Sequence, residues 1–415
     1  MTYRKFKADY LFTGRELAAA DSVLITSGDG TVQSIVPAAE AGEGVELYSG
    51  LLSPGFINCH CHLELSHLKG MIPERTGLVD FLSTVIRQRG QAGPAGGGGH
   101  TAGGGGHTAA EGGHREMVSA AIAAGEQEML SGGIVAVGDI CNTADTVSQK
   151  AGGRLYYHNF IETMGFIEQG APDRFARALE VFHAFAGAYA LPIESNSIVP
   201  HAPYSVSPAL FRLIARFPGN HLLTIHNQES EAENEFYLTG KGDFLRLYQL
   251  LGLDVSFFRG TGKRSLASWL PYFHRNQSII LVHDVATGAE DLEAAMGGDT
   301  DLFFCLCPNA NLYIGGQLPD VELMQRYGCD MVIGTDSLAS NHQLSILEEL
   351  KTLQRAFPQL STSTLLYWAT ASGAGALQLD AVVGSFLPRR QPGVLIIDHL
   401  EGGRLGENST VRRLV

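Results

Sequence analysis

The sequence predicts an α/β protein whose main part is a (β/α)8 barrel. Short apolar runs alternate with stretches that have the length and pattern of helices, over about 320 residues. Five of these stretches place a His or an acidic residue at or near the end of a run, which is where barrels of this type carry their active sites. A doubly wound sheet could use the same strands, but it would not need functional side chains at so many strand ends.

Eight segments are candidate barrel strands, because each is a short apolar run followed by residues with a helix-compatible pattern or length. In chain order they are residues 55–62, 134–140, 155–162, 195–201, 222–226, 279–283, 302–307 and 330–335.

The two ends of the chain have a different pattern. Residues 10–52 contain short β-like segments broken by Gly and Asp, which is typical of hairpins rather than of a βα repeat. Residues 379–415 return to a short β pattern. We therefore expect the barrel at residues 53–378, with residues 1–52 and 379–415 outside it.

A glycine-rich segment interrupts the pattern at residues 93–113. It contains the near-repeat GGGGHTA and three histidines spaced by seven, His100, His107 and His114. Glycine loses more backbone entropy on ordering than any other residue, so this composition predicts a flexible insertion before a helix that starts near Glu116. The alternative interpretation is a metal-scavenging tract.

The bulk composition limits the classes of function. The 415 residues include 45% hydrophobic and 17% charged residues and have a formal charge of −14, which suits a globular protein and argues against nucleic-acid or anionic-membrane binding. No apolar run is long enough for a membrane helix, and the basic N-terminus lacks the apolar core of a signal peptide, so we expect a cytoplasmic protein. The six Cys are expected to be small buried side chains rather than disulfides.

The five strand-end stretches contain the side chains that metal sites use. His60 and His62 are two residues apart in one strand, so they point the same way and can bind one ion. Zinc and similar ions take imidazole nitrogen and carboxylate oxygen, and His226 and Asp336 extend the set to three His and one Asp. Taken singly, each could be a core His or a helix-capping Asp. Together, at the carboxyl ends of barrel strands, they favour a metal site.

The sequence segments around these residues resemble those of the amidohydrolase superfamily, and most of all those of its cytosine-deaminase and chlorohydrolase-like branch. They are "SPGFINCHCHLELSHLKG", "HNQESEAE", "CPNAN" and "GTDSLASN", and the resemblance runs from residue 53 to residue 376. The longer phrase "HNQESEAENEFYLTGKGDFLRLYQLLG" is similar to the aminodeoxyfutalosine deaminases. The resemblance implies a (β/α)8 TIM barrel with a small β-sandwich domain formed from both chain termini.

The resemblance also implies a role for each strand-end residue. His60, His62, His226 and Asp336 would hold one divalent ion, zinc first and iron as the alternative. His283 would position the nucleophilic water, with Asp336 taking its proton. His201 would lie next to the substrate and donate a hydrogen bond to it, although the sequence does not distinguish such a donor from a second metal ligand.

Glu229 is the predicted proton donor. It follows His226 by three residues, just beyond the strand end, where a carboxyl group can protonate a ring nitrogen during attack on the adjacent carbon. Its alternative interpretation is a solvated charge at a helix start. Superfamily members with two metals commonly bridge them by a modified Lys on the fourth strand, and no Lys occurs between Glu194 and Ser205, so a single ion is expected.

Other polar residues are candidate substrate contacts, and loop capping is the alternative interpretation for those in loops. These loop candidates are Glu64, Ser66 and Asn309, with Asn311, Ser337, Ser340 and Asn341 as further rim residues. His201 and Glu162 at their strand ends are also substrate-binding candidates, and the alternative for Glu162 is a residue that bridges two metals.

The predicted reaction is hydrolytic deamination of an amino-substituted nitrogen heterocycle, either purine nucleoside-like or pyrimidine-like. Two alternatives remain from different classes. One is a one-metal hydrolase of a cyclic amide (imidazolone-type) or of a chlorinated ring, and the other is a non-catalytic barrel that serves as a binding module. The expected partner is a small-molecule substrate, with no nucleic acid and no membrane, and a homodimer is left open.

Overall fold

Eight parallel strands form the centre of the protein in a computed structural model that describes residues 2–91, 109–187 and 195–415. They fall into two four-stranded sheets, ordered β10-β9-β8-β7 and β11-β12-β13-β14. Their bounds are β7 (Phe56–Cys61), β8 (Ile134–Cys141), β9 (Tyr156–Thr163), β10 (Asn196–Pro200), β11 (Leu222–Asn227), β12 (Ser278–His283), β13 (Asp301–Leu306) and β14 (Asp330–Ile333).

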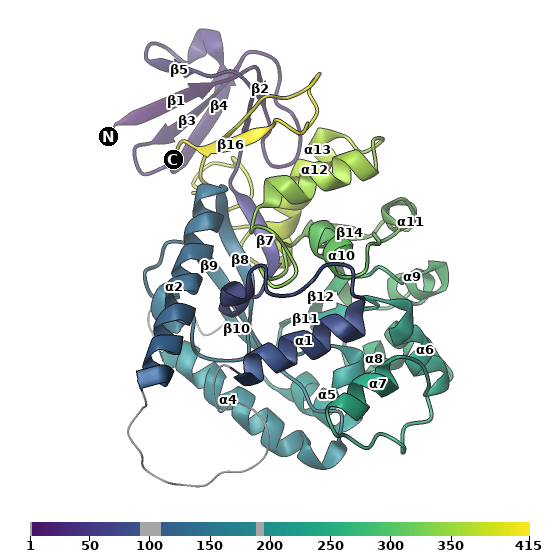
Figure 1. The fold of residues 1–415 in the computed structure, drawn as a ribbon. Helices are drawn as coiled ribbons and strands as arrows, with labels where there is room; N and C mark the ends of the chain where they lie inside the picture. The colour runs from purple at the N-terminus through teal and green to yellow at the C-terminus, as the bar shows by residue number, and fades with distance from the viewer. Residues whose placement is uncertain (1, 92–108, 188–194) are drawn as a thin grey trace.

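Backbone hydrogen bonds at both edges join the two sheets into a ring. The N–H of His226 in β11 donates to the carbonyl of His201, directly after β10, at 3.0 Å. On the other side, the N–H of Thr335 donates to the carbonyl of His60 in β7, also at 3.0 Å. The barrel predicted from the sequence is therefore confirmed, and each predicted strand overlaps an observed one (Figure 1).

Helices follow the strands and cover the outside of the ring (Figure 1). α5 shows how the sequence builds one: Ser207 caps its start by accepting from Leu210 N–H at 3.3 Å, and Pro208 occupies its first turn. The helices are α1 (Leu78–Gln91), α2 (Ala109–Ser131), α3 (Val147–Lys150), α4 (Ala171–Gly187), α5 (Pro208–Arg216), α6 (Glu231–Thr239), α7 (Phe244–Leu250), α8 (Ser265–Trp269), α9 (Ala289–Met296), α10 (Pro308–Ile314), α11 (Val321–Arg326), α12 (Ile346–Ala356), α13 (Thr362–Tyr367) and α14 (Gly373–Ala376).

The start of α2 corrects one expectation. The helix predicted to begin near Glu116 begins at Ala109, so residues 109–113 are helical rather than part of a flexible insertion. Alanine and glutamate are strong helix formers, and "AAE" at 109–111 extends the helix across the two glycines that follow. The rest of the glycine-rich segment, with His100 and His107, lies outside the described residues.

Strands from both chain ends form two further sheets beside the barrel (Figure 1). One, ordered β4-β3-β1-β5, comes from the N-terminal end: β1 (Tyr3–Lys7), β3 (Ser22–Ser27), β4 (Val32–Pro37) and β5 (Val45–Leu47). The other is ordered β16-β15-β6-β2 and pairs β2 (Tyr10–Leu11) and β6 (Leu51–Ser53) with β15 (Leu395–Asp398) and β16 (Thr410–Arg413). Phe6, Leu52 and Ile396 pack in their shared core, so the two termini depend on each other.

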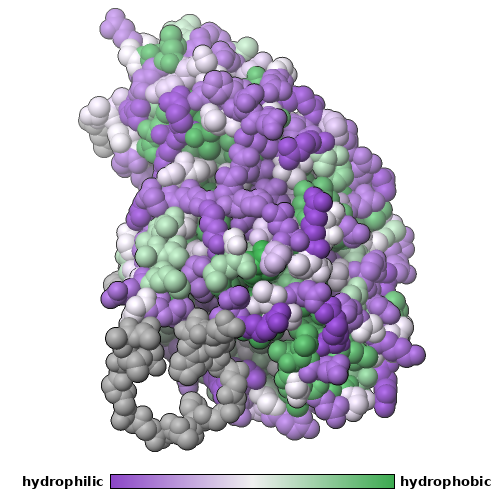
Figure 2. Space-filling view, viewed as in Figure 1, coloured by the Kyte–Doolittle hydropathy of each residue, from purple (hydrophilic) through white to green (hydrophobic). Residues whose placement is uncertain are grey.

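The visible surface in Figure 2 is mainly hydrophilic, with apolar side chains gathered at its lower right, where Figure 1 places α7. Leu245 and Leu250 of that helix are among the exposed large hydrophobic residues. No helix in the described residues is long and apolar enough to cross a membrane.

Candidate active site

Four predicted metal ligands meet at the carboxyl end of the barrel. His60 lies in β7, His62 directly after it, His226 in β11 and Asp336 just beyond β14. The Nε2 atom of His62 is 3.2 Å from Nε2 of both His60 and His226, and Asp336 Oδ1 is 3.5 Å and 3.4 Å from Nε2 of His60 and His62. Ligand atoms that surround zinc as a tetrahedron at 2.0–2.1 Å lie about 3.3 Å apart. The four side chains therefore fit one ion.

Their protonation states also suit a metal. His226 Nδ1 is 2.8 Å from the carbonyl of His201, so Nδ1–H donates and the lone pair is on Nε2, which faces the other ligands. Burial lowers the pKa of His60 to about 4. Burial alone would raise the pKa of Asp336, but the hydrogen bond from His60 and the charges of nearby histidines hold it well below its usual value. Neutral imidazole and carboxylate are the forms that bind metals, and His60 and Asp336 are held in these forms near neutral pH.

Asp336 is held in one orientation. Its φ of +56° is in the left-handed region, which is uncommon outside glycine. The Ser340 hydroxyl donates to Asp336 Oδ2 at 2.5 Å, and the N–H of Asp336 donates to the His60 carbonyl at 3.0 Å. These contacts leave Oδ1 facing the histidines.

A hydrogen bond to α10 fixes His283 in one tautomer. Its Nδ1 is 2.7 Å from Oδ1 of Asn311 in α10, and an amide oxygen only accepts. Nδ1–H therefore donates, and Nε2 carries the lone pair. Burial lowers the pKa of His283, which keeps the ring neutral and able to accept a hydrogen bond.

Glu229 faces this lone pair. Its Oε1 is 3.7 Å from His283 Nε2, and its side chain is 7% exposed. Burial raises the pKa of Glu229 to about 8, so its carboxyl group is largely protonated near neutral pH. A buried acid in this state can donate a proton to a ring nitrogen.

A cavity of about 130 Å³ opens over these residues. One wall is apolar and comes largely from α1, through Phe81, Leu82, Val85 and Ile86. A larger cavity of about 620 Å³ lies between Phe166, Phe258 and Tyr272, but no predicted ligand or proton-transfer residue lines it. The chemistry therefore belongs to the smaller cavity.

Of the five predicted substrate contacts, the structure places two in the cavity wall and three elsewhere. Glu162 and His201 line the cavity. Glu64, Ser66 and Asn309 are not among its lining residues in the described part of the chain.

Hydrogen bonds to neighbouring loops and helices hold these three residues, and their contact with a substrate stays a prediction. Glu64 Oε2 accepts from the N–H groups of Asn142 and Thr143 at 3.0 and 3.1 Å, and Ser66 Oγ donates to the Leu63 carbonyl at 2.7 Å. Asn309 is bound to α12: its N–H donates to Glu349 Oε2 at 2.8 Å, and its Oδ1 accepts from Thr352 Oγ1 at 2.6 Å.

The structure adds two candidate functional residues. Asn311, predicted only as a rim residue, contacts His283, whereas Asn142 lines the cavity and donates to Glu162 Oε2 at 2.7 Å. Asn142 directly follows β8, so the strand-end rule that selected the histidines could also have selected it. The apolar wall from α1 carried no such signal, because apolar helix residues are usually core.

A second group, Glu162, His201 and His226, also brings potential ligand atoms within 4.8 Å of one another. His226 cannot serve both groups, since its Nδ1 contacts the His201 carbonyl and its Nε2 faces the first set. The geometry thus favours one ion.

Known proteins resemble this chain in sequence and in fold. The sequence model of the amidohydrolase family matches residues 51–400. The aminodeoxyfutalosine deaminase of Nitratiruptor sp. is 25% identical over 362 residues, which cover 85% of this chain and 80% of the relative. The crystal structure of Helicobacter pylori aminofutalosine deaminase in complex with methylthio-coformycin has a TM-score of 0.78 and 21% identity, covering 96% of this chain and 93% of that one. An adenosine deaminase structure from Xanthomonas campestris with bound zinc has a TM-score of 0.68 and 22% identity, covering 95% and 84%.

Proposed function

The chain belongs to the amidohydrolase family, whose members are metal-dependent hydrolases, and we propose that it deaminates an amino-substituted nitrogen heterocycle, with a purine nucleoside-like compound as the first candidate. The observation that carries the proposal is the buried Glu229 carboxyl group beside His283, next to the four candidate metal ligands. A deaminase needs this combination, because it must activate water and make a neutral ring electrophilic at the same pH.

We propose His60, His62, His226 and Asp336 as the ligands of a single zinc ion. The donor set of three imidazoles and one carboxylate suits zinc and also iron, and zinc is bound in the Xanthomonas campestris adenosine deaminase structure. When bound, the ion would supply a nucleophile near neutral pH by lowering the pKa of a water molecule from 15.7 toward about 7.

The chain's own residues then divide the proton transfers. His283 Nε2 accepts a hydrogen bond from the nucleophilic water and orients it, and the Asp336 carboxylate takes its proton. Glu229 gives its proton to the ring nitrogen next to the carbon under attack. Asp336 then passes its proton to the exocyclic amine, which leaves as ammonia. The new hydroxyl group on the ring returns a proton to Glu229 as it becomes a carbonyl oxygen, so both carboxyl groups are restored and one water is consumed for each ammonia released.

Substrate recognition is proposed for the cavity walls. Glu162 and His201 can exchange hydrogen bonds with a polar ring edge or with hydroxyl groups. The apolar wall from α1 suits a less polar part of the same molecule. The aminodeoxyfutalosine and adenosine deaminases among the relatives support a purine nucleoside-like substrate.

An ammonia-release screen tests the proposal. The purified protein is supplied with zinc and offered adenosine-like, guanine-like, cytosine-like and triazine compounds, with aminodeoxyfutalosine included. Ammonia formed in equal amount to the deaminated product supports the proposal. Chloride release or a ring-opened acid without ammonia would identify the other one-metal hydrolases, and binding without turnover would identify a binding module.

A further inference from the structure

Gln228 is a buried polar residue beside the candidate site. It lies directly after β11, between the candidate ligand His226 and the proposed proton donor Glu229. Its side chain is completely buried, and its φ of +44° is in the left-handed region. A long polar side chain in this position must satisfy its hydrogen-bonding groups inside the protein.

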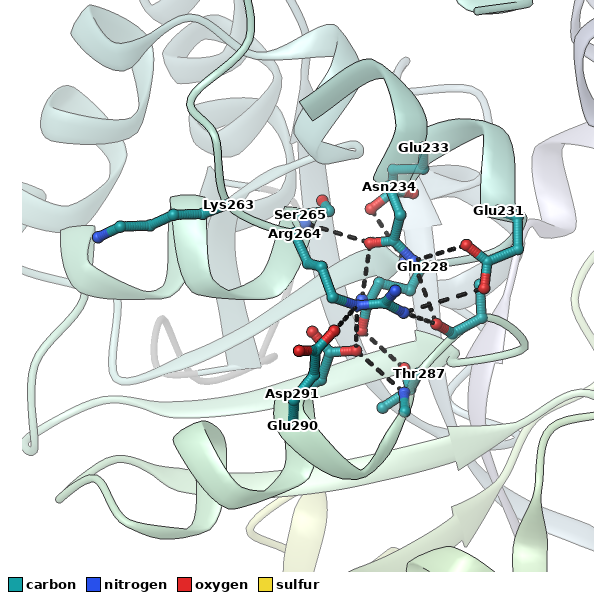
Figure 3. Close-up of polar contacts among 12 residues, drawn as sticks. Gln228, Glu231, Glu233, Asn234, Lys263, Arg264, Ser265, Thr287, Glu290 and Asp291 are labelled. Carbon is teal, nitrogen blue, oxygen red and sulfur yellow. Dashed lines mark hydrogen bonds and ion pairs between the residues drawn. The ribbon is translucent and has the colours of Figure 1, made fainter. Parts of the chain in front are cut away.

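All four polar groups of Gln228 have partners, as Figure 3 shows for its side chain. Nε2 donates to Asn234 Oδ1 at 2.9 Å, and Oε1 accepts from Thr287 Oγ1 at 2.8 Å. The backbone N–H donates to Glu233 Oε1 at 3.0 Å, and the backbone carbonyl accepts from Ala286 N–H at 2.7 Å. The residue is therefore held at both its backbone and its side-chain end.

The partners belong to two different elements. Glu233 and Asn234 are in α6, which begins two residues after Glu229. Ala286 and Thr287 are in the loop that follows His283 at the end of β12. Gln228 thus connects the turn that carries Glu229 with the loop that leads away from His283.

The rest of the network makes this connection rigid. Asn234 Nδ2 donates to the Ala286 carbonyl at 3.1 Å, and its Oδ1 also accepts from the Ser265 N–H at 3.2 Å. Arg264 donates to the same Ala286 carbonyl at 2.6 Å and to Asp291 Oδ2 at 2.8 Å (Figure 3). Two of the four partners of Gln228, Asn234 and Ala286, are therefore held by further hydrogen bonds from residues 264 and 265.

We propose that Gln228 is a positioning residue that sets the distance between Glu229 and His283, and so acts on catalysis through Glu229. This inference rests on the proposed function, in which Glu229 donates a proton. Displacement of a reacting group by about 1 Å can cost on the order of 100-fold in rate. The alternative is a network that only stabilises the fold.

The test is Gln228→Leu, which keeps the side-chain size and removes both hydrogen-bonding groups. Its matched control is Gln277→Leu. Gln277 is also buried and its Nε2 donates to the carbonyls of Ala215 and Asn220 at 3.3 and 3.0 Å, but it lies directly before β12, at the end of that strand far from the site.

We expect Gln228→Leu to lower kcat on the order of 10- to 100-fold, with bound zinc and KM close to wild type. Gln277→Leu should keep the wild-type kcat. In a Glu229→Gln background, Gln228→Leu should lower the residual kcat by less than about twofold, because residues that act as a unit are not additive. Three outcomes would overturn the proposal. They are an unchanged kcat in Gln228→Leu, an equal loss of kcat from Gln228→Leu in the wild-type and Glu229→Gln backgrounds, and an equal loss of kcat in Gln277→Leu.

Hydrogen–deuterium exchange provides a readout that needs no substrate. Peptides that cover residues 226–236 and 283–290 should exchange faster in Gln228→Leu than in wild type, and not in Gln277→Leu. Unchanged exchange in both peptides would also overturn the proposal. If Glu229→Gln alone keeps the wild-type kcat, the proposed mechanism is wrong, and the exchange result then decides separately whether Gln228 holds the two loops together.

Discussion

In the proposed mechanism, proton donation depends on one buried carboxyl group, that of Glu229. We predict that Glu229→Gln retains the metal and loses kcat by about 100- to 10,000-fold, the usual contribution of general acid catalysis. Gln keeps the shape of the side chain but has no proton to give at neutral pH. His60→Ala, which removes a ligand, should lose both metal and turnover, and metal analysis beside steady-state kinetics distinguishes the two. Near-wild-type turnover in Glu229→Gln would exclude this mechanism.

The same carboxyl group predicts the pH dependence. Burial raises the pKa of Glu229 to about 8. The active form is the protonated one, which is present below this pKa and lost above it. We therefore expect kcat/KM to fall above about pH 8, by about tenfold per pH unit. The residual activity of Glu229→Gln should lack this fall, and a wild-type rate that rises through pH 8 would contradict the assignment.

Asn311 should affect kcat through its hydrogen bond to the imidazole of His283. Asn311→Leu removes the acceptor of His283 Nδ1–H, so the tautomer and orientation of the ring are no longer fixed. We expect a loss of about 10- to 100-fold in kcat, as for other partners that orient a functional His. Asn309→Leu on the same helix is the control: it should lower Tm, because it breaks contacts with α12, and leave kcat within about twofold. Equal kcat losses in the two variants would refute the distinction.

These two asparagines also show which site residues could be predicted from the sequence and which could not. His60, His62, His226, Glu229, His283 and Asp336 could be grouped into one candidate site because strand ends in a barrel converge on one face, whereas their individual roles came from the family resemblance. Asn309 and Asn311 lie in the same helical turn, and which of them points inward depends on where α10 begins and how it packs against α12. That is tertiary information, which a local pattern does not contain.

At the scale of elements, a buried ion pair supports the loop after β7. Lys150 Nζ in α3 lies 2.5 Å from Asp139 Oδ2 in β8, and Asp139 Oδ1 accepts from the N–H of Leu63, next to the proposed ligand His62. Lys150→Met leaves the Asp139 carboxylate buried without its cation. We expect the free energy of unfolding to fall by about 3–5 kcal/mol, measured by urea denaturation.

The exposed Lys69, which pairs with Glu128 at 3.3 Å, is the matched control. Lys69→Met should change the free energy of unfolding by less than about 1 kcal/mol, since water screens such pairs. Similar values for the two lysines would show that the Lys150–Asp139 pair adds nothing beyond an ordinary surface contact.

Strands were predictable as elements, whereas helix starts were less so. Each barrel strand is an apolar run that is buried on both faces, a signal that survives in one sequence. The start of α2 at Ala109 was missed because glycine dominates the composition of this segment. The residues AAE at 109–111, just before Gly112 and Gly113, nevertheless favour a helix.

For the whole molecule, we propose domain limits of residues 53–378 for the barrel and of 1–52 with 379–415 for the β part. The pairing of β6 with β15 supports this division, because it joins the two ends of the chain next to the first barrel strand. The sequence indicated both β-rich ends, but their pairing is a contact between distant segments that only the family resemblance implied.

Metal removal should affect the stability of the whole barrel. An ion that binds only the folded state adds about 2.7 kcal/mol when its free concentration is 100 times its Kd. We expect a chelator to lower Tm by several degrees, measured by scanning calorimetry. Asp336→Ala should show little response to the chelator, and a wild-type Tm that is insensitive to the chelator would argue against an ion in this site.

The closure of the ring between β7 and β14 has a consequence for the growing chain on the ribosome. His60 and His62 are made early, but they meet Asp336 only when the last barrel strand has been synthesised and pairs with the first. Until residue 336 is made, the nascent chain holds first two and, after His226, three of its proposed ligands without the carboxylate that completes the set. The ion-binding form is thus restricted to chains translated past Asp336, and premature termination before that codon leaves a product without the complete site.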